Sequence, residues 1–296
     1  MADDSLTPAQ RQILEARHTF QRIVELRVEP VEGVFDATHL KEINRRIFQD
    51  LPGLGFPDAT PGQYRPPVPN GNDWIKTRKL ETVGIRSTVA YSPMDEKSSD
   101  RLMDLLTNVD PTYFSKLSKT AFTAEIGKLY SEIDYIHPFP DGNSRTLREF
   151  TRQLAEKSGY VINWERFNQS PAGRDILYIA RDQSVNKLAL PLIQHDDTRR
   201  AIILSMDQLD GNRDLQDLLK DAVETQAEPS LEEQLSEKLE VQATADSQIP
   251  EPSIEEQISD TYQSVYKVKI SPAKNSKSQQ IESLNVDDED QPEMDN

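Results

Sequence analysis

Large aromatic side chains are confined to one part of this chain, and this limits which residues can build a core. Of the twenty Phe, Tyr and Trp residues, only Tyr262 and Tyr266 lie beyond residue 207. Residues 208–296 instead hold 22 acidic and 7 basic side chains, a net charge of −15 within the chain's total of −17. So polar a segment cannot offset the cost of ordering a backbone, about 1–2 kcal/mol per residue. We therefore expect a folded domain over 1–207, a marginal amphipathic helix over 208–224 and a disordered acidic C-terminal tail over 225–296.

The expected tail contains a short repeat. The segment EPSLEEQLS at 228–236 recurs as EPSIEEQIS at 251–259, 23 residues later. In each copy a Ser precedes a Glu by three positions, which is the pattern of a helix capping box. The copies are either docking motifs that fold on a partner or duplicated linker sequence that is only transiently helical.

The composition excludes several classes of protein. Acidic side chains outnumber basic ones by 51 to 34, which argues against binding to nucleic acid or to anionic membranes. Without Cys there is no disulfide, thiolate zinc site or Cys nucleophile. The chain has no run of 18 apolar residues, and its N-terminus is acidic, unlike a Sec signal. We expect a cytoplasmic protein, or one delivered into a host cytosol without a Sec signal.

Most of residues 1–207 have the apolar spacing of helices, so the expected fold class is all-α. Pro8 suits a first helical turn, and Asp36 suits an N-cap. The expected helices are one after Pro8 with Ile13, Phe20, Ile23 and Val24; one after Asp36 with Leu40, Ile43, Ile47 and Phe48; one after Pro111 with Phe122, Ile126, Leu129, Ile133 and Ile136; one after Gly142 with Leu147, Phe150 and Leu154, ending near Gly159; and shorter ones near 172–181 and 184–194.

The stretch from Pro57 to Pro93 differs from the rest, because it is rich in Pro and Gly and has no helical period. Within it, residues 85–91 (IRSTVAY) are β-prone and can form half of a hairpin. An isolated two-stranded ribbon is marginal in water, so a hairpin on a helical domain needs a functional reason.

The segment with the clearest chemistry is 136–150, IHPFPDGNSRTLREF, which joins two expected helices. The start of the second helix offers unpaired N–H groups and a positive dipole end, which attract anions. Gly142 and Asn143 tolerate the tight backbone that turns these N–H groups inward. Arg145 and Arg148 lie at i, i+3 and can bind phosphate oxygens.

Two further side chains complete this candidate site. Asp141 is a hard oxygen ligand suited to a Mg²⁺ that bridges phosphates. His137 lies at the mouth of the loop and titrates near neutrality, as a general base requires. Together they describe a nucleotide polyphosphate site with a base beside it.

Each part also has an ordinary structural explanation. A His before Pro is commonly structural or exposed, Gly-Asn is common turn chemistry, and Asp141 can cap a helix. Arg145 and Arg148 can pair with Glu149 or Glu125. The conjunction of these residues within 137–148 favours the nucleotide site.

The same residues resemble a known family. His137-Pro-Phe-Pro-Asp-Gly-Asn-Ser-Arg145, followed by Arg148, is similar to the Fic-domain signature His-x-Phe-x-acid-Gly-Asn-(Gly or Lys)-Arg with a second Arg. Residues 130–136 resemble the family's preceding helix, and residues 39–50 resemble its early helix that ends in Phe-Gln-Asp. The resemblance covers about 8–207. It implies a helical Fic core with a small β-hairpin flap within 76–92.

By this resemblance the chain transfers AMP from ATP to a hydroxyl of a target protein. His137 would accept the proton of the attacking Ser, Thr or Tyr hydroxyl, and Asp141 would hold Mg²⁺. The flap would hold the target segment by strand addition. The anion hole would comprise Gly142, Asn143 and Ser144; Arg145 and Arg148 would bind the phosphates; and Phe139 would anchor the loop.

Three positions depart from the family pattern. Ser144 stands where Gly or Lys is favoured; it retains its N–H, and the absence of Lys favours AMP transfer over kinase chemistry. Asp134 stands where Asn is more usual. A Trp-Ala-Gly segment that commonly follows Phe-Gln-Asp is missing, and Gly62-Gln-Tyr-Arg65 is its closest counterpart.

Other functions stay open at this point. His137 and Asp141 at i, i+4 also suit a hydrolytic metal site, although the other histidines lie in unrelated segments. A binding module would grip nucleotide without turnover. A related transferase would use UTP, GTP or a phosphocholine carrier, because the phosphate loop does not read the base.

Many family members carry an inhibitory helix, Ser/Thr-x-x-x-Glu-Gly/Asn, whose Glu pairs with the second motif arginine. Residues 92–97, 120–126 and 28–33 each fail this pattern. We therefore expect that inhibition is not built into this chain and that Arg148 is free for phosphate, unless a separate small antitoxin-like protein supplies the Glu.

Overall fold

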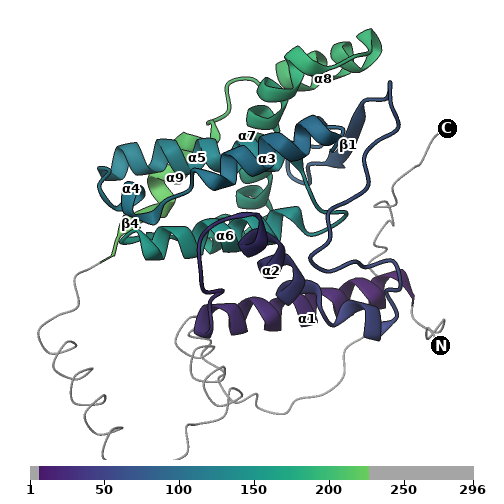
Figure 1. Ribbon diagram of the computed structural model, residues 1–296. Helices are drawn as coiled ribbons and strands as arrows, with labels where there is room; N and C mark the ends of the chain where they lie inside the picture. The colour runs from purple at the N-terminus through teal and green to yellow at the C-terminus, as the bar shows by residue number, and fades with distance from the viewer. Residues whose placement is uncertain (1–6, 227–296) are drawn as a thin grey trace, which may run out of the picture. The chain divides into compact units, whose positions relative to one another are not determined.

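The computed structural model describes residues 7–226, which lie within one compact unit (Figure 1). The helices are α1 (Pro8–Val28), α2 (Ala37–Phe48), α3 (Glu96–Thr107), α4 (Pro111–Ser115), α5 (Lys119–Ile136), α6 (Asn143–Lys157), α7 (Pro171–Ala189), α8 (Asp196–Gln208) and α9 (Leu215–Ala222), with short 3₁₀ turns at Leu51–Leu54, Trp164–Phe167 and Leu190–Leu192. Two small antiparallel sheets are present: β1 (Trp74–Lys79) and β2 (Arg86–Tyr91) form a hairpin, and β3 (Tyr160–Ile162) pairs with the distant β4 (Val223–Thr225). The expected all-α class with a small β-hairpin is confirmed. No helix within residues 7–226 is long and apolar enough to cross a bilayer.

The helices begin where the sequence offers caps. Thr7 closes a capping box on α1 and Pro8 follows it in the first turn. Asp36 accepts a hydrogen bond from the His39 N–H at the start of α2. The helix expected after Pro111 is divided, because Pro111 begins the short α4 and Ser118 caps the longer α5.

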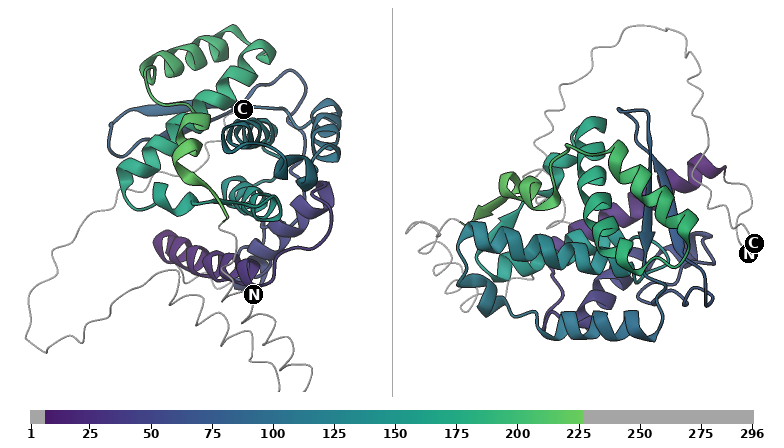
Figure 2. Two further views of the ribbon diagram at one scale, coloured as in Figure 1. Left: turned by 90° about the vertical axis from the view of Figure 1, so that its left-hand side faces the viewer. Right: turned by 90° about the horizontal axis from the view of Figure 1, so that it is seen from above.

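Helix α5 lies at the centre of the described residues, in contact with α6, α7 and α9. The left view of Figure 2 looks along α5 and α6 and shows the other helices around them. The apolar stripe predicted on α5 is fully buried, as are its counterparts on α2 and α6; the buried residues include Leu40, Ile43, Ile47, Phe122, Ile126, Ile133, Ile136, Leu147, Phe150 and Leu154. Burying each such side chain contributes about 1.5–3 kcal/mol.

The β1–β2 hairpin packs against α7 and α8. The hairpin begins at Trp74, two residues before the start of the range 76–92 in which the flap is predicted. Trp74 pairs with Tyr91 at the base of the hairpin. Asn186 of α7 binds β2 like a strand: its Oδ1 accepts from the Ala90 N–H at 3.1 Å, and its Nδ2 donates to the Thr88 carbonyl at 2.9 Å. The outer edge of β2 is therefore paired by a helix side chain.

One expectation about element boundaries is corrected. The short helices expected near 172–181 and 184–194 form one helix, α7, because no breaker separates them. Within 208–224, where a marginal amphipathic helix is expected, the structure has α9, and β4 follows it. Leu215, Leu218 and Leu219 are buried in the main core. The tail expected from 225, with its repeat, lies almost wholly outside the described residues.

Candidate active site

The loop between α5 and α6 begins at His137, which ends α5 in the left-handed conformation with φ +48°. This conformation is uncommon for a residue with a side chain, and its surroundings must hold it in place. Arg65 does so: its Nε donates to the His137 carbonyl at 2.8 Å, and its Nη2 donates to the carbonyls of Ser92 and Ile136. The Arg65 guanidinium also lies 3.7 Å from the Trp74 ring centroid.

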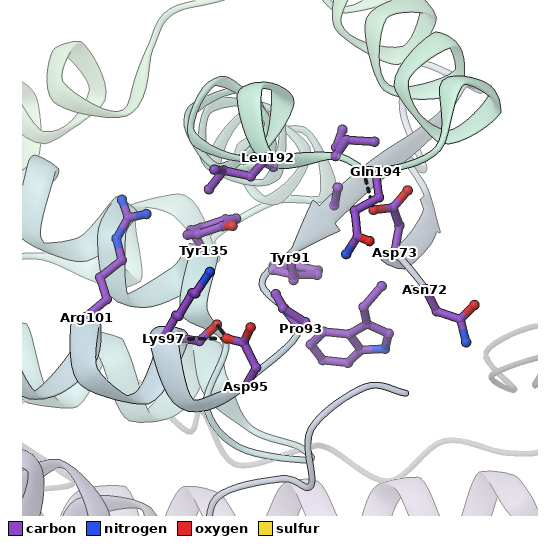
Figure 3. A pocket seen from close by; sticks show the side chains of 15 residues that line it. Asn72, Asp73, Tyr91, Pro93, Asp95, Lys97, Arg101, Tyr135, Leu192 and Gln194 are labelled. Carbon is purple, nitrogen blue, oxygen red and sulfur yellow. Dashed lines mark hydrogen bonds between the residues drawn. The ribbon is translucent and has the colours of Figure 1, made fainter. Parts of the chain in front are cut away.

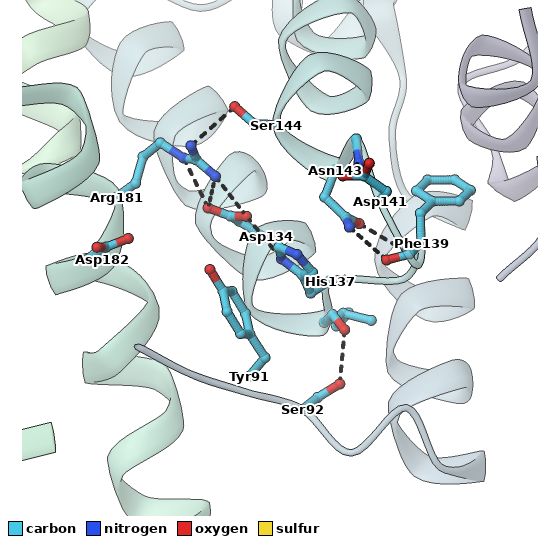
Figure 4. Close-up of polar contacts among 12 residues, drawn as sticks. Tyr91, Ser92, Asp134, His137, Phe139, Asp141, Asn143, Ser144, Arg181 and Asp182 are labelled. Carbon is cyan, nitrogen blue, oxygen red and sulfur yellow. Dashed lines mark hydrogen bonds and ion pairs between the residues drawn. The ribbon is translucent and has the colours of Figure 1, made fainter. Parts of the chain in front are cut away.

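Asn143 fixes the middle of the loop. Its Oδ1 accepts from the Phe139 N–H at 3.0 Å, and its Nδ2 donates to the Phe139 carbonyl at 2.7 Å (Figure 4). Phe139 is fully buried and packs on Tyr64 with a ring-centroid distance of 5.3 Å. Asn143 is therefore a structural brace, and the predicted anchor position of Phe139 agrees with its burial.

Gly142 precedes α6 with φ +72°, and a Cβ at this position would lie inside the Phe48 ring. Glycine is required here by both conformation and space. No side chain caps α6, and within residues 7–226 the N–H groups of residues 143–145 have no acceptor. The helix start is therefore open to an anion.

His137 lies beneath the hairpin and is buried. Its ring centroid is 4.0 Å from that of Tyr91 and 5.4 Å from that of Trp74. Burial lowers the pKa of His137 to about 4, while Asp134 acts in the opposite direction. The imidazole is therefore uncharged at neutral pH, which is the proton-accepting form.

Behind His137 lies a buried ionic network that the sequence did not reveal (Figure 4). Asp134 receives hydrogen bonds from Arg181 of α7 on both oxygens, at 3.0 and 2.8 Å. Arg181 also donates from Nη1 to the Ser144 Oγ at 3.1 Å. Burial opposes the charge of Asp134, but Arg181 and His137 together outweigh it and the pKa of Asp134 falls to about 2. The pair is therefore ionised throughout the physiological range.

The two motif arginines have different surroundings. Arg145 donates to Glu15 at 2.7 Å and to Thr19 at 3.1 Å, both on α1, so its partner is neither of the glutamates considered from the sequence. Arg148 donates from Nε to the Ser144 carbonyl at 3.3 Å, and within residues 7–226 it has no ion pair with a carboxylate. Burial lowers the pKa of Arg148. An anion beside it would supply the missing countercharge.

Asp141 is the exposed carboxylate at the loop. Its Oδ1 accepts from the Gly142 N–H at 2.6 Å, and its Oδ2 lies 3.9 Å from the Arg145 Nη2. Its side chain is 77% exposed. Within residues 7–226 no group of three or more His, Asp or Glu side chains is arranged to hold a metal ion. A lone accessible carboxylate fits a Mg²⁺ ion whose other ligands are phosphate oxygens and water.

Two cavities adjoin these residues. Trp74 and Tyr91, which contact the His137 ring, also line a cavity of about 370 Å³ between the hairpin, α3 and the 190–192 turn (Figure 3). A second cavity of about 280 Å³ lies between Asp141, Phe48 and Glu15. Of the seven residues predicted for the site, none lines the first cavity and Asp141 alone lines the second.

The structure brings together all seven residues predicted for the site, since they occupy one loop and the first two turns of one helix. It adds residues that sequence reasoning missed, from separate parts of the chain: Glu15, Arg65, Trp74, Tyr91 and Arg181. Their signals were weak. Arg65 belonged to the segment already singled out, and Arg181 is a charge within the apolar spacing of α7.

Comparison with known proteins gives a match for this region. Residues 34–155 match the model of the Fic/DOC family. The protein adenylyltransferase VbhT of Bartonella schoenbuchensis is 28% identical over 162 residues, which cover 54% of this chain and 29% of that protein. A protein adenylyltransferase of Bartonella henselae is 24% identical over 146 residues, which cover 49% of this chain and 26% of that protein. The chain thus spans less than a third of the length of these curated relatives.

Solved structures are also similar to this chain. The N-terminal Fic domain of a cell filamentation protein from Bartonella quintana, crystallised with bound ADP, has a TM-score of 0.48 and 21% identity. The match covers 76% of this chain and 90% of that structure.

Proposed function

Residues 34–155 of this chain match the Fic/DOC family model, and from this match we propose that the chain is a member of that family and transfers AMP from ATP to a hydroxyl side chain of a target protein. The relatives named above are protein adenylyltransferases, which supports this reaction for the shared region. The transfer joins the target oxygen to the α-phosphorus of ATP and releases pyrophosphate.

One observation carries the proposal: an uncharged histidine lies on the same short loop as an open helix start. The pKa of His137 is about 4, so its imidazole can accept a proton at neutral pH. Six residues later, the unpaired N–H groups at the start of α6 are available for phosphate oxygens. A general base and a phosphate-binding helix start are the two groups that nucleotidyl transfer requires at the least.

In this proposal His137 takes the proton of the target hydroxyl as that oxygen attacks the α-phosphorus. The backbone of Gly142, Asn143 and Ser144 stabilises the charge on the phosphate oxygens. Rate enhancement comes chiefly from holding the nucleophile and phosphate in line. Phe139 and Asn143 contribute by keeping the loop in one conformation.

The arginines are assigned to the phosphates. Arg148 is suited to this role because it is partly buried and has no carboxylate partner within the described residues. Arg145 is held by Glu15, so contact with a phosphate requires that this ion pair be exchanged. Arg148 is therefore the stronger candidate of the two.

We assign Asp141 to Mg²⁺, on the basis of its exposed oxygen beside the phosphate cradle. When bound, the ion would neutralise phosphate charge and favour departure of pyrophosphate. Its remaining ligands would be phosphate oxygens and water, because the described residues place no cluster of three or more His, Asp or Glu side chains around Asp141.

The target segment is assigned to the hairpin. Within residues 7–226 the outer edge of β1 has no backbone partner, whereas that of β2 is covered by Asn186. An extended target can pair with β1. The cavity behind Trp74 and Tyr91 would then accept a neighbouring target side chain. We also propose that a separate small antitoxin-like protein inhibits the transfer.

The test uses ATP labelled at the α-phosphorus and, separately, at the γ-phosphorus. The proposal expects α-label on protein in the presence of Mg²⁺ and no transfer of γ-label. Hydrolysis without protein labelling would indicate a hydrolase, and binding without turnover would indicate a nucleotide-binding module. In parallel incubations, protein labelling from UTP, GTP or a phosphocholine donor, but not from ATP, would indicate the same type of transfer with a different donor.

A further inference from the structure

We infer that Asp134 and Arg181 act together as positioning residues for the proposed reaction: the pair ties the end of α5 to the start of α6, and the Asp134 carboxylate keeps the proton of neutral His137 on Nδ1. This inference rests on the proposed function for its kinetic consequence only. The state of the imidazole can be measured without any turnover.

The ion pair is built to be rigid. Arg181 approaches Asp134 with Nε at 3.1 Å from Oδ2 and Nη2 at 2.8 Å from the same oxygen, while Nη2 also reaches Oδ1 at 3.0 Å. Both side chains are only 2% exposed. Several hydrogen bonds in a buried, planar arrangement leave the carboxylate one orientation. Asp134 is therefore fixed relative to the helix that carries His137.

The same guanidinium also reaches the other half of the site. Its Nη1 donates to the Ser144 Oγ in the first turn of α6, at 3.1 Å. Ser144 is one of the residues assigned to the phosphate cradle. One side chain from α7 thus bonds both to the carboxylate behind the base and to the helix that would hold the phosphates (Figure 4). Their separation is set by Arg181.

The position of Asp134 selects one tautomer of His137. The Asp134 Oδ1 lies 3.5 Å from the His137 Nδ1, which has no other partner within residues 7–226. A proton on Nδ1 is attracted by the carboxylate, whereas a lone pair there is repelled. With the proton on Nδ1, the other ring nitrogen, Nε2, carries the lone pair that accepts a proton. The long contact sets a preference by charge rather than by a strong hydrogen bond.

The other groups facing His137 make this carboxylate necessary. Lys76 from β1 and Arg65 from the preceding loop are cations that disfavour an imidazolium, and Tyr91 from β2 supplies an aromatic ring. Asp134 is the one carboxylate paired with the ring among the described residues. It would therefore offset the positive charge that His137 acquires when it accepts a proton.

Two departures from the family pattern now have a common explanation. Position 134 has Asp in place of the more usual Asn, and position 144 has Ser in place of Gly or Lys. Both side chains contact Arg181, the Asp as its counterion and the Ser as a hydrogen-bond acceptor. The two side chains suit a site in which an arginine from α7 bonds to both α5 and α6.

The first test is a ¹⁵N NMR measurement of the histidine tautomer at neutral pH, in a chain with four histidines. Wild type is expected to hold the proton on Nδ1, and Asp134→Asn is expected to give a mixture of tautomers. Glu149→Gln is the matched control, because Glu149 forms a similarly buried pair with Arg152. It should leave His137 unchanged. An unchanged tautomer in Asp134→Asn would overturn the inference.

Asp134→Asn leaves the buried Arg181 without its counterion and can fail to fold. The double variant Asp134→Asn/Arg181→Gln removes both charges and retains groups that can hydrogen-bond. If it folds, as its thermal transition shows, the inference expects the same mixture of tautomers. A single Nδ1–H tautomer in the folded double variant would contradict it.

The second test is kinetic. Asp134→Asn should lower kcat about tenfold or more with little change in KM for ATP, because it acts through the base. Ser144→Ala removes only the Arg181 contact with α6 and should raise KM for ATP without changing the tautomer. If wild type transfers no AMP but the tautomer shifts as expected, the proposed function fails and the inference stands. Normal transfer with an unaffected kcat in Asp134→Asn would reject the inference alone.

Discussion

Two independent effects oppose replacement of Gly142 by a larger residue, and mutations can separate them. Its φ of +72° is unfavourable for other residues, and a Cβ would overlap the Phe48 ring. Gly159 has φ +78° but open space around its Cβ position. Replacement of Gly159 by Ala therefore measures the conformational cost alone.

We expect Gly142→Ala to lower the free energy of unfolding by about 2–4 kcal/mol, since overlap adds to strain. Gly159→Ala should cost about 1 kcal/mol. Denaturant unfolding measures both. Equal costs for the two variants would show that the contact with Phe48 is unimportant, whereas relief of Gly142→Ala by Phe48→Leu would support it.

The buried imidazole predicts a pH dependence of stability. The folded pKa of His137 is about 4, below its ordinary value of 6.5, so the unfolded chain binds more protons between these pH values. Stability is therefore lost as the pH falls through this window. His137→Gln lacks this linkage. Wild type should lose about 2–3 kcal/mol relative to the variant between pH 7 and pH 4, as measured by urea unfolding. Parallel stability curves for the two proteins would contradict this.

At the residue scale, the sequence was informative where function is carried by adjacent residues. The loop from His137 to Arg148 could be assigned because its residues are contiguous and their chemistry converges. Glu15 and Arg181 could not, because each acts across more than thirty positions of sequence. Nothing in a linear pattern connects a charge on α1 or α7 to this loop.

At the element scale, helix starts were predictable because capping is local. Asp36 caps α2 and Pro8 lies in the first turn of α1, as the sequence predicts. Helix α7 was divided in the prediction because polar residues interrupt its apolar spacing. Those residues, Arg181, Asp182 and Asn186, are buried for another reason: they bond to other elements of the fold. Tertiary polar contacts are invisible to a periodicity argument.

The contact between Asn186 and β2 predicts local stability in the hairpin. Asn186→Ala removes an acceptor from the Ala90 N–H and a donor from the Thr88 carbonyl. Each lost hydrogen bond costs about 1 kcal/mol or more because the groups are partly buried. Amide hydrogen exchange at Ala90 should speed up by about tenfold or more.

Ser205→Ala is the comparison for this variant, because it removes only the acceptor of the Thr88 N–H. It should speed exchange at Thr88 and leave Ala90 protected. If Asn186→Ala leaves Ala90 as protected as in wild type, β2 is held by the β1 ladder and by packing alone.

At the scale of the whole molecule, the sequence alone could not show that residues 215–223 pack into the core. Charge and aromatic content change near residue 207, yet Leu215, Leu218 and Leu219 complete the core beside α5. The short amphipathic segment is marginal by itself and is stabilised by the surface that it covers. Its partner surface cannot be read from its own sequence.

Truncation separates the two boundaries. A chain ending at residue 226 should retain the cooperative thermal transition and nucleotide turnover of the full chain, because the removed residues are highly charged and contain only two aromatics. A chain ending at residue 207 should lose that transition, because it lacks α9 and β4. Calorimetry tests both. If the chain ending at residue 226 lost the transition, part of the tail would belong to the core. If that chain kept nucleotide turnover but no longer labelled the target, the tail would have a role in recruiting substrate.

The central claim is that His137 and the start of α6 form a nucleotidyl-transfer site. Intact-mass analysis after incubation with Mg-ATP, using this chain alone and with a bait lysate, tests it most directly. The account predicts a mass gain of one AMP on the chain or on a bait protein, abolished by His137→Ala while calorimetric binding of Mg-ATP is nearly unchanged. A gain of the same size with His137→Ala would contradict the assigned base, and no AMP gain on any protein with wild type would contradict the proposed reaction.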